Sequence, residues 1–313
     1  MAGTQFQGFP RGWFVIAFSD DIGVGEVRSM EYFGQRLVAF RTESGQVRVL
    51  DAHCPHLGAD LGVGGTVEGE SIRCPFHAWR FDGAGTCIDV PYAKKIPPKA
   101  KTRSWDVSEK NGVIFVWHDR QGNPPTYEMP TIEVYGHPDW LPWNGSCLRI
   151  RTHPREIVEN VADKAHFPRV HGTHVDEFEN EYIDHMAIQK TKGIAYPRGG
   201  GKDHFALTAT YYGPGCQITE MDSFIDNRLL LAHTPIDEEF LDLRFGVSLK
   251  IGDDQAQTEA FSSQYADNLR TGFHEDIAIW ENKLYRERPI LCDGDGPIAK
   301  LRRWYMGFYE TVN

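Results

Sequence analysis

Short runs in which apolar and polar residues alternate fill the first third of the chain, and alternation of this period predicts β-strands. Residues 35–40 and 47–50 are two such runs, and the Thr-Glu-Ser-Gly segment at 42–45 predicts a hairpin turn between them. Residues 113–117 predict a further strand, and the Gln-Gly-Asn-Pro-Pro run at 121–125 breaks the pattern. We therefore expect a β-rich domain over residues 1–130 and a second domain over residues 131–313.

The second part of the chain mixes helical and strand patterns. Residues 155–167 predict a helix, because Pro154 suits its start and Pro168 suits its end. Residues 204–212 and 244–251 alternate as strands, whereas residues 263–284 place apolar side chains on one helical stripe. That stripe comprises Leu269, Phe273, Ile277, Trp280 and Leu284. The expected fold class is α+β.

Composition narrows the class of protein. The chain has 313 residues, of which 41% are hydrophobic, and its formal net charge is -11. That charge disfavours nucleic acid and anionic membrane surfaces as partners, and no run of about 18 apolar residues predicts a membrane span. The polar start of the chain lacks the apolar core of a signal peptide. Six cysteines are too few for a disulfide scaffold at this length. We expect a cytoplasmic enzyme.

Two cysteines stand beside histidines in mixed pairs, Cys54-Pro-His56 and Cys74-Pro-Phe-His77, with 17 residues between the pairs. A Rieske [2Fe-2S] centre needs two thiolates on one iron and two imidazoles on the other, and each pair offers one of each. A structural zinc site is the alternative, but zinc fingers usually keep cysteines and histidines in separate pairs. The mixed spacing favours the iron–sulfur cluster.

A second group of metal-binding residue types follows in the other domain. Asp163 and His166 are three residues apart on the same face of the predicted helix, and His171, which follows Pro168, can fold back beside His166. Two histidines and one carboxylate are typical of non-haem iron(II) oxygenases, in which open positions remain for dioxygen and substrate. Asp276 is the predicted carboxylate ligand, because it falls on the apolar stripe, where an unpaired charge would be unfavourable. The alternative is that these histidines are ordinary polar residues.

Both patterns, in this order, resemble the α-subunits of Rieske oxygenases. Among these the sequence is most similar to the family of 3-ketosteroid 9α-hydroxylase oxygenase components, and the likeness covers nearly the whole chain. The segments that carry it are Cys74-Pro-Phe-His77, Val90-Pro-Tyr-Ala93, Thr102-Arg-Ser-Trp105, Phe115-Val-Trp-His118, Gly122-Asn-Pro-Pro125, residues 160–171, Asp295-Gly-Pro297 and Leu301-Arg-Arg-Trp-Tyr305.

The resemblance implies a Rieske β-sandwich domain followed by a helix-grip catalytic domain with an antiparallel sheet. It implies a homotrimer that receives electrons from a separate NADH-dependent reductase carrying flavin and an iron–sulfur centre. It places Asp276 at the family's iron carboxylate, in agreement with the helix phase. It also implies that the cluster of one subunit faces the mononuclear iron(II) of the next. Asp163 would then connect His166 to His77 of the neighbouring subunit through its carboxylate, as the residue of electron transfer.

The reaction class is defined more closely than the substrate. In the strand predicted over residues 211–222, where the steroid pocket would be lined, the chain has Tyr211 and the polar pair Gln217 and Thr219. Phe273 and Trp280 suit an apolar ring system. We predict hydroxylation by dioxygen of a bulky, apolar small molecule, a steroid being the favoured class. The chain ends at Asn313, where the hydroxylases carry a longer C-terminal extension.

Four other functions remain open from the sequence. The same scaffold supports desaturation and demethylation. A Rieske electron carrier with an added ligand-binding domain would need no second iron, and an iron count separates it from an oxygenase. A zinc-stabilised lipid-binding module would be colourless.

Overall fold

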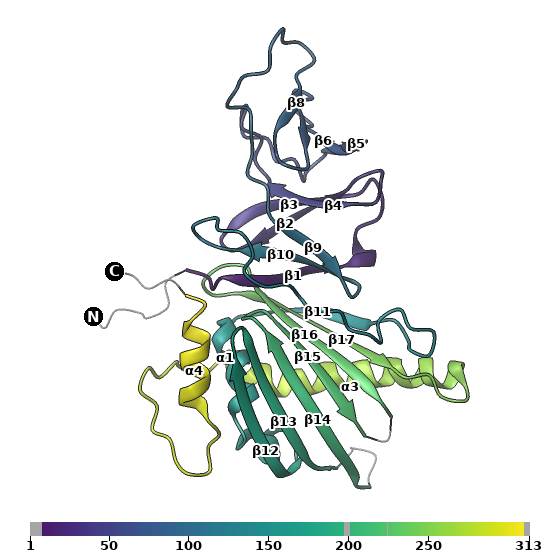
Figure 1. Cartoon of the computed structure of the whole chain (residues 1–313), viewed down its shortest axis with the longest axis vertical. Helices are drawn as coiled ribbons and strands as arrows, with labels where there is room; N and C mark the ends of the chain where they lie inside the picture. The colour runs from purple at the N-terminus through teal and green to yellow at the C-terminus, as the bar shows by residue number, and fades with distance from the viewer. Residues whose placement is uncertain (1–7, 197–200, 224, 310–313) are drawn as a thin grey trace. The chain divides into compact units, whose positions relative to one another are not determined.

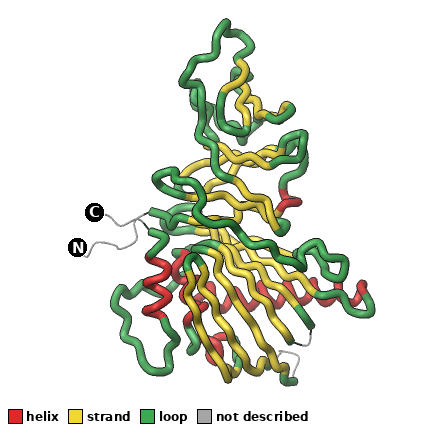
Figure 2. Tube along the Cα trace, in the orientation of Figure 1, coloured by secondary structure: helices red, strands yellow, loops and turns green. Residues whose placement is uncertain are grey.

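The computed structural model describes residues 8–196, 201–223 and 225–309. The chain forms two compact units, one comprising Val15–Thr126 and the other Met1–Phe14 together with Tyr127–Asn313. Strands dominate both units (Figures 1 and 2). Because antiparallel sheets are combined with few helices, the predicted α+β class is confirmed.

The smaller unit is built from short strands in three antiparallel sheets, β1-β10-β9, β2-β3-β4 and β5-β6-β7-β8. The single 3-10 helix described in it is η1 (Ser19–Asp21). The strands are β1 (Gly12–Phe18), β2 (Val27–Tyr32), β3 (Gln35–Arg41), β4 (Val47–Asp51), β5 (Thr66–Glu68), β6 (Ser71–Arg73), β7 (Arg80–Asp82), β8 (Cys87–Asp89), β9 (Val107–Lys110) and β10 (Val113–His118).

The predicted hairpin is confirmed, since β3 and β4 pair with Leu37 opposite Asp51 and Arg41 opposite Val47. Its buried side chains continue into a core that also contains Cys54 and Cys74, each only 3% exposed. The first Cys/His pattern therefore lies partly inside the hydrophobic core of this unit. Metal ligands in such surroundings are shielded from water, which helps to hold their geometry.

The larger unit contains one seven-stranded antiparallel sheet in the order β11-β17-β16-β15-β14-β13-β12 (Figure 1). The strands are β11 (Asn144–Ile150), β12 (His174–Ile183), β13 (Met186–Ala195), β14 (Asp203–Tyr212), β15 (Cys216–Asp222), β16 (Asn227–Pro235) and β17 (Leu241–Leu249). The helices are α1 (Pro154–Val158), η2 (Glu159–Ala162), α2 (His166–Val170), α3 (Gln255–Trp280) and α4 (Ile298–Met306).

Helix α3 crosses one face of this sheet and carries the predicted apolar stripe. Phe273 lies 5.0 Å from Phe245 of β17 between ring centroids, and Ile277 and Trp280 pack with Leu243 in one buried cluster. The helix begins earlier than predicted, because the Asp254 side chain accepts a hydrogen bond from the Gln257 amide as its N-cap. Within the described residues, no helix is both long and apolar enough to cross a membrane.

The predicted continuous helix over residues 155–167 is wrong. The chain is helical from Pro154 to Ala162, and Asp163 then adopts an extended conformation with φ -91° and ψ 92°. A new helix, α2, starts at His166 and contains Pro168 in its first turn, where the missing proline N–H has no helical partner to lose. Asp163 and His166 are therefore joined by a turn and do not share a helix face.

Candidate metal centres

The Cys/His pairs lie on two loops with the same backbone hydrogen bonds. In the first, the Cys54 amide donates to the Ala59 carbonyl and the Gly58 amide donates to the Cys54 carbonyl; in the second, Cys74 pairs with Trp79 and Ala78 in the same way. The fourth residue after each cysteine has a positive φ, 79° at Gly58 and 59° at Ala78. Each loop can therefore turn its cysteine and histidine toward a shared centre.

The side chains of these loops converge. The His56 and His77 rings lie 4.6 Å apart between centroids, and His56 stacks on Trp79 at 4.6 Å. His77 Nδ1 is buried and has no hydrogen-bond partner among the described residues. A buried imidazole nitrogen without a partner is unfavourable unless a metal binds it. Burial also raises the pKa of the Cys54 thiol to about 11, and a metal is what would hold this group as a thiolate. The donor set fits a Rieske cluster.

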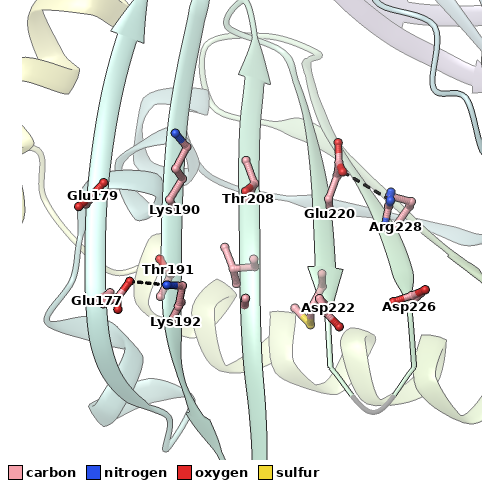
Figure 3. Close-up of a pocket in the computed structure, with 13 residues that line it drawn as sticks. Glu177, Glu179, Lys190, Thr191, Lys192, Thr208, Glu220, Asp222, Asp226 and Arg228 are labelled. Carbon is pink, nitrogen blue, oxygen red and sulfur yellow. Dashed lines mark ion pairs between the residues drawn. The ribbon is translucent and has the colours of Figure 1, made fainter.

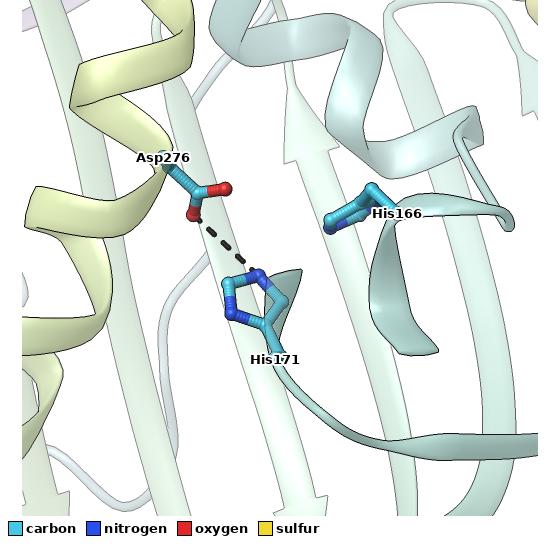
Figure 4. Close-up of side chains that lie close together, drawn as sticks. All are labelled: His166, His171 and Asp276. Carbon is cyan, nitrogen blue, oxygen red and sulfur yellow. Dashed lines mark ion pairs between the residues drawn. The ribbon is translucent and has the colours of Figure 1, made fainter. Parts of the chain in front are cut away.

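His166, His171 and Asp276 meet in the larger unit (Figure 4). One ligand atom from each lies within 4.8 Å of the others, and His171 Nε2 is 3.5 Å from Asp276 Oδ2. His166 Nδ1 lies 2.5 Å from the Asp163 carbonyl oxygen. Since a carbonyl only accepts, this bond holds the proton on Nδ1 and leaves His166 Nε2 as the metal-binding atom. The sequence-based choice of Asp276 over Glu275 agrees with burial, because Asp276 is 6% exposed and Glu275 is exposed.

The electrostatics of this cluster also fit a cation. Burial raises the pKa of Asp276 to about 6, although nearby His171 lowers it. Burial lowers the pKa of His166 and of His171, so both imidazoles favour the neutral, ligating form. A carboxylate that burial destabilises as an anion is stabilised by a bound metal ion. Two neutral histidines and one carboxylate fit iron(II) with open positions.

Asp163 caps the turn before α2. Its Oδ1 accepts hydrogen bonds from the Ala165 amide at 3.1 Å and the His166 amide at 3.3 Å. Its Oδ2 is 4.0 Å from His166 Nδ1, with the carboxylate side chain 38% exposed. The predicted bond from the Asp163 carboxylate to the His166 ring is therefore wrong in its atoms, because the backbone carbonyl takes that place. A half-exposed carboxylate beside a metal ligand remains.

The segment before these ligands is held closely from two sides. Asn180 of β12 donates its amide to the Val161 carbonyl at 2.7 Å. A Cβ added to Gly296 would lie 1.8 Å from the Ala162 carbonyl oxygen, so only glycine allows this approach. The Asp295-Gly-Pro297 motif thus supports the backbone that leads into Asp163.

The predicted substrate residues fall on the α3 side of the sheet. Tyr211 and Gln217 are not on one strand, as the sequence suggested, but on β14 and β15, where they are directly opposite each other. Thr219 lies on the same face, since its neighbour Met221 accepts a hydrogen bond from Tyr265 of α3. Gln217 Nε2 donates to Thr219 Oγ1 at 3.0 Å.

Three of the five predicted residues are buried and bonded to protein neighbours, namely Tyr211, Thr219 and Trp280. Tyr211 is fully buried and its hydroxyl lies 3.2 Å from His233 Nε2. The Trp280 indole is 5% exposed and donates to Asn160 Oδ1. Phe273 is half-buried against Phe245. Gln217 and Phe273 are consequently the two of the set with side-chain surface left to offer a ligand.

The opposite face of the sheet carries a charged hollow (Figure 3). Its charges pair with each other, as in Lys192 with Glu177 at 2.8 Å and Arg228 with Glu220 at 3.4 Å. A site for an apolar ligand has apolar walls with few polar groups. This surface therefore does not match the predicted substrate.

Comparison with known proteins identifies the family. Residues 12–121 match the Rieske [2Fe-2S] domain, and residues 116–309 match the 3-ketosteroid 9alpha-hydroxylase C-terminal domain. The chain belongs to the 3-ketosteroid 9α-hydroxylase family. It is a Rieske-type monooxygenase component with a [2Fe-2S] domain, as the sequence predicted.

Relatives of this 3-ketosteroid 9α-hydroxylase family member extend the comparison. A 3-ketosteroid-9-alpha-monooxygenase oxygenase component from Rhodococcus rhodochrous is 38% identical over 97% of this chain and 82% of its own length. A cholesterol 7-desaturase from Ciona intestinalis is 32% identical over 96% of this chain and 69% of its own. The structure of dicamba monooxygenase bound to dicamba has a TM-score of 0.79 at 21% identity and covers 96% of this chain and 98% of that chain. This last similarity shows the fold alone.

Asn160 lies at this centre, and the sequence did not predict a role for it. It lies in η2, accepts a hydrogen bond from the Trp280 indole, and its side chain lowers the pKa of Asp276. Its position three residues before Asp163 was the only signal in the sequence, and the predicted helix gave no reason to connect it with α3.

Proposed function

We propose that the chain is the oxygenase component of a multi-component system that hydroxylates a bulky apolar substrate of the steroid class with dioxygen. Electrons come from a separate NADH-dependent reductase, and the chain holds the cluster through Cys54, His56, Cys74 and His77. The observation that carries the proposal is the cluster of His166, His171 and the buried Asp276 in a chain that also contains a Rieske domain. When bound there, iron(II) would supply the activation of dioxygen. The chain's own residues bind the substrate and keep water away.

The steroid class is supported by relatives and by the pocket face. The Rhodococcus rhodochrous relative is named for a 3-ketosteroid, and a ring system of this kind needs an apolar surface with a few polar groups. Phe273 offers the apolar surface, and Gln217 offers an amide. The test is turnover of a steroid panel with a compatible reductase and NADH, read by mass spectrometry. Activity on small charged acids alone would contradict it.

Gln217 should set the preference for oxygenated substrates. Gln217→Leu replaces the amide with an apolar side chain of similar size. The KM for steroids bearing a keto or hydroxyl group should therefore rise about 5- to 30-fold, as expected for one lost hydrogen bond of about 1–2 kcal/mol. The kcat should change less. The control variant is Gln189→Leu, because Gln189 lies on the same sheet but is 3% exposed and donates a hydrogen bond to Thr191. Equal KM values for wild type and Gln217→Leu would show that Gln217 does not line the pocket.

Desaturation is the second candidate, because one relative is named a cholesterol 7-desaturase. Both reactions begin with removal of a hydrogen atom from carbon. The product mass separates them, since hydroxylation adds one oxygen and desaturation removes two hydrogens.

The ligand assignment of the cluster has its own test. The purified chain should be brown and, once reduced, show a rhombic Rieske electron paramagnetic resonance signal. Cys54→Ala should remove that signal, whereas Cys292→Ala, at an exposed cysteine of the other unit, should retain it. A colourless chain with one zinc would refute the assignment, and iron in the cluster alone would favour an electron carrier.

The homotrimer is supported by the surface around His77. Leu57, Phe76 and Tyr92 are large apolar residues exposed by 66%, 60% and 61%. The Phe76 ring lies 3.7 Å from the His77 ring and the Tyr92 ring 6.3 Å, between centroids. Apolar side chains exposed together mark a contact surface. A second copy of this chain would cover them and bring its own iron centre to the cluster.

A further inference from the structure

We propose that Asn160 is a positioning residue that links the Asp276 carboxylate to the Trp280 indole. This inference rests on the proposed metal centre and adds a residue pair that orients its carboxylate ligand. Trp280 Nε1 donates to Asn160 Oδ1 at 3.4 Å, and the Asn160 side chain lies near enough to Asp276 to lower the pKa of that carboxyl.

The chemistry of the three groups fixes the orientation of the Asn160 amide. An indole N–H can only donate and an ionised carboxylate can only accept, whereas a primary amide does both through different atoms. With Asn160 Oδ1 occupied by the indole, its Nδ2 is the atom that faces the carboxylate. Trp280 therefore determines which way round the amide lies, and the amide presents a donor to Asp276.

The positions of the residues suit this role. Asp276 and Trp280 are four residues apart, so they lie on the same face of α3 on successive turns. Asn160 comes from η2, the segment that leads to His166. Both α3 residues are buried, Asp276 to 6% and Trp280 to 5% exposure. In a buried site, a hydrogen bond to a carboxylate restrains its rotation more than it would in water.

A further contact holds the backbone of Trp280. Thr152 Oγ1 donates to the Trp280 carbonyl at 3.2 Å, which gives one of the last carbonyls of α3 a partner. The linked residues thus tie the carboxylate on α3 to the segment that carries the histidine ligands. Residues that orient metal ligands through hydrogen bonds affect metal affinity by about 10- to 100-fold.

The experiment measures Co(II) affinity at the mononuclear centre in protein that retains its cluster. Asn160→Ala should weaken Co(II) binding about 10- to 100-fold, with the cluster spectrum unchanged. Trp280→Phe keeps an aromatic ring but removes the N–H, so the amide can turn its oxygen toward Asp276. That variant should shift affinity in the same direction by a smaller factor. Asn282→Ala, at an exposed asparagine bonded to the Ala278 carbonyl, should bind Co(II) like wild type.

A double-mutant cycle separates positioning from general loosening of the structure. If the residues act in series, Asn160→Ala with Trp280→Phe should bind Co(II) no more weakly than Asn160→Ala alone. Additive effects, or wild-type affinity in Asn160→Ala, would overturn the inference. Should Asn160→Ala fail to fold, unchanged affinity in Trp280→Phe would overturn it equally. If wild type binds no Co(II) outside the cluster, the proposed metal centre fails instead.

Discussion

Asp276→Ala should lose the mononuclear metal and all measurable hydroxylation while its cluster stays intact. Asp276 is the single carboxylate among the three clustered ligands, and its Oδ2 lies 3.5 Å from His171 Nε2. Its removal leaves two neutral imidazoles, which bind iron(II) weakly without an anionic partner. Since loss of a residue that merely orients a ligand weakens binding by about 10- to 100-fold, loss of the ligand should exceed that range.

The measurement is iron per chain together with the reduced cluster spectrum. Wild type should contain three irons, and the variant should keep the two of the cluster. Glu275→Ala is the matched control, since Glu275 adjoins Asp276 on α3 but is exposed. Full iron content and turnover in Asp276→Ala would show that another carboxylate completes the centre.

The sequence predicted those features that depend on spacing along a single element. The Cys54 and Cys74 pairs identified the cluster because each loop contains its own cysteine and histidine. The position of Asp276 was predicted because the α3 stripe obeys one helical period from Leu269 to Trp280. Leu284 fails the same rule, being 73% exposed, because the helix ends at Trp280 before that turn.

Features that depend on local competition for hydrogen bonds could not be predicted. The continuous helix over residues 155–167 was wrong because the Asp163 side chain captures the amides of Ala165 and His166. An aspartate that bonds to the backbone in this way favours a turn over a helix. The break also exchanges the roles of Asp163 atoms, so that its carbonyl and not its carboxylate meets the His166 ring.

Long-range polar contacts could not be predicted from the sequence either. Trp280 was predicted to line the pocket because its ring is apolar, yet its indole N–H bonds to Asn160, 120 residues earlier. No periodicity connects η2 to α3. The same limit applied to Tyr211 and Gln217, because the turn that separates β14 from β15 lies within a segment that read as one strand.

The half-exposed carboxylate of Asp163 suits contact with a neighbouring subunit. It follows the segment held by Asn180 and Gly296, so its backbone is fixed. Its Oδ1 is used by two amides, while the side chain keeps 38% of its surface exposed. On the proposed trimer, the carboxylate would accept a hydrogen bond from the outward ring nitrogen of a second copy's His77. The Asp163 carbonyl bond to His166 would then continue the path from that cluster to the iron centre.

Asp163→Asn should slow electron transfer from cluster to iron by about 10- to 100-fold without emptying either metal site. The amide can still cap the turn through its oxygen, but it loses the charge that strengthens the bond to a histidine. The measurement is a single turnover in which reoxidation of the reduced cluster is followed after mixing with substrate and dioxygen. Asp139→Asn, at an aspartate whose side chain is 68% exposed and pairs with His137, is the control and should reoxidise at the wild-type rate. Wild-type reoxidation in Asp163→Asn, with trimer and metals intact, would limit Asp163 to capping the turn before His166.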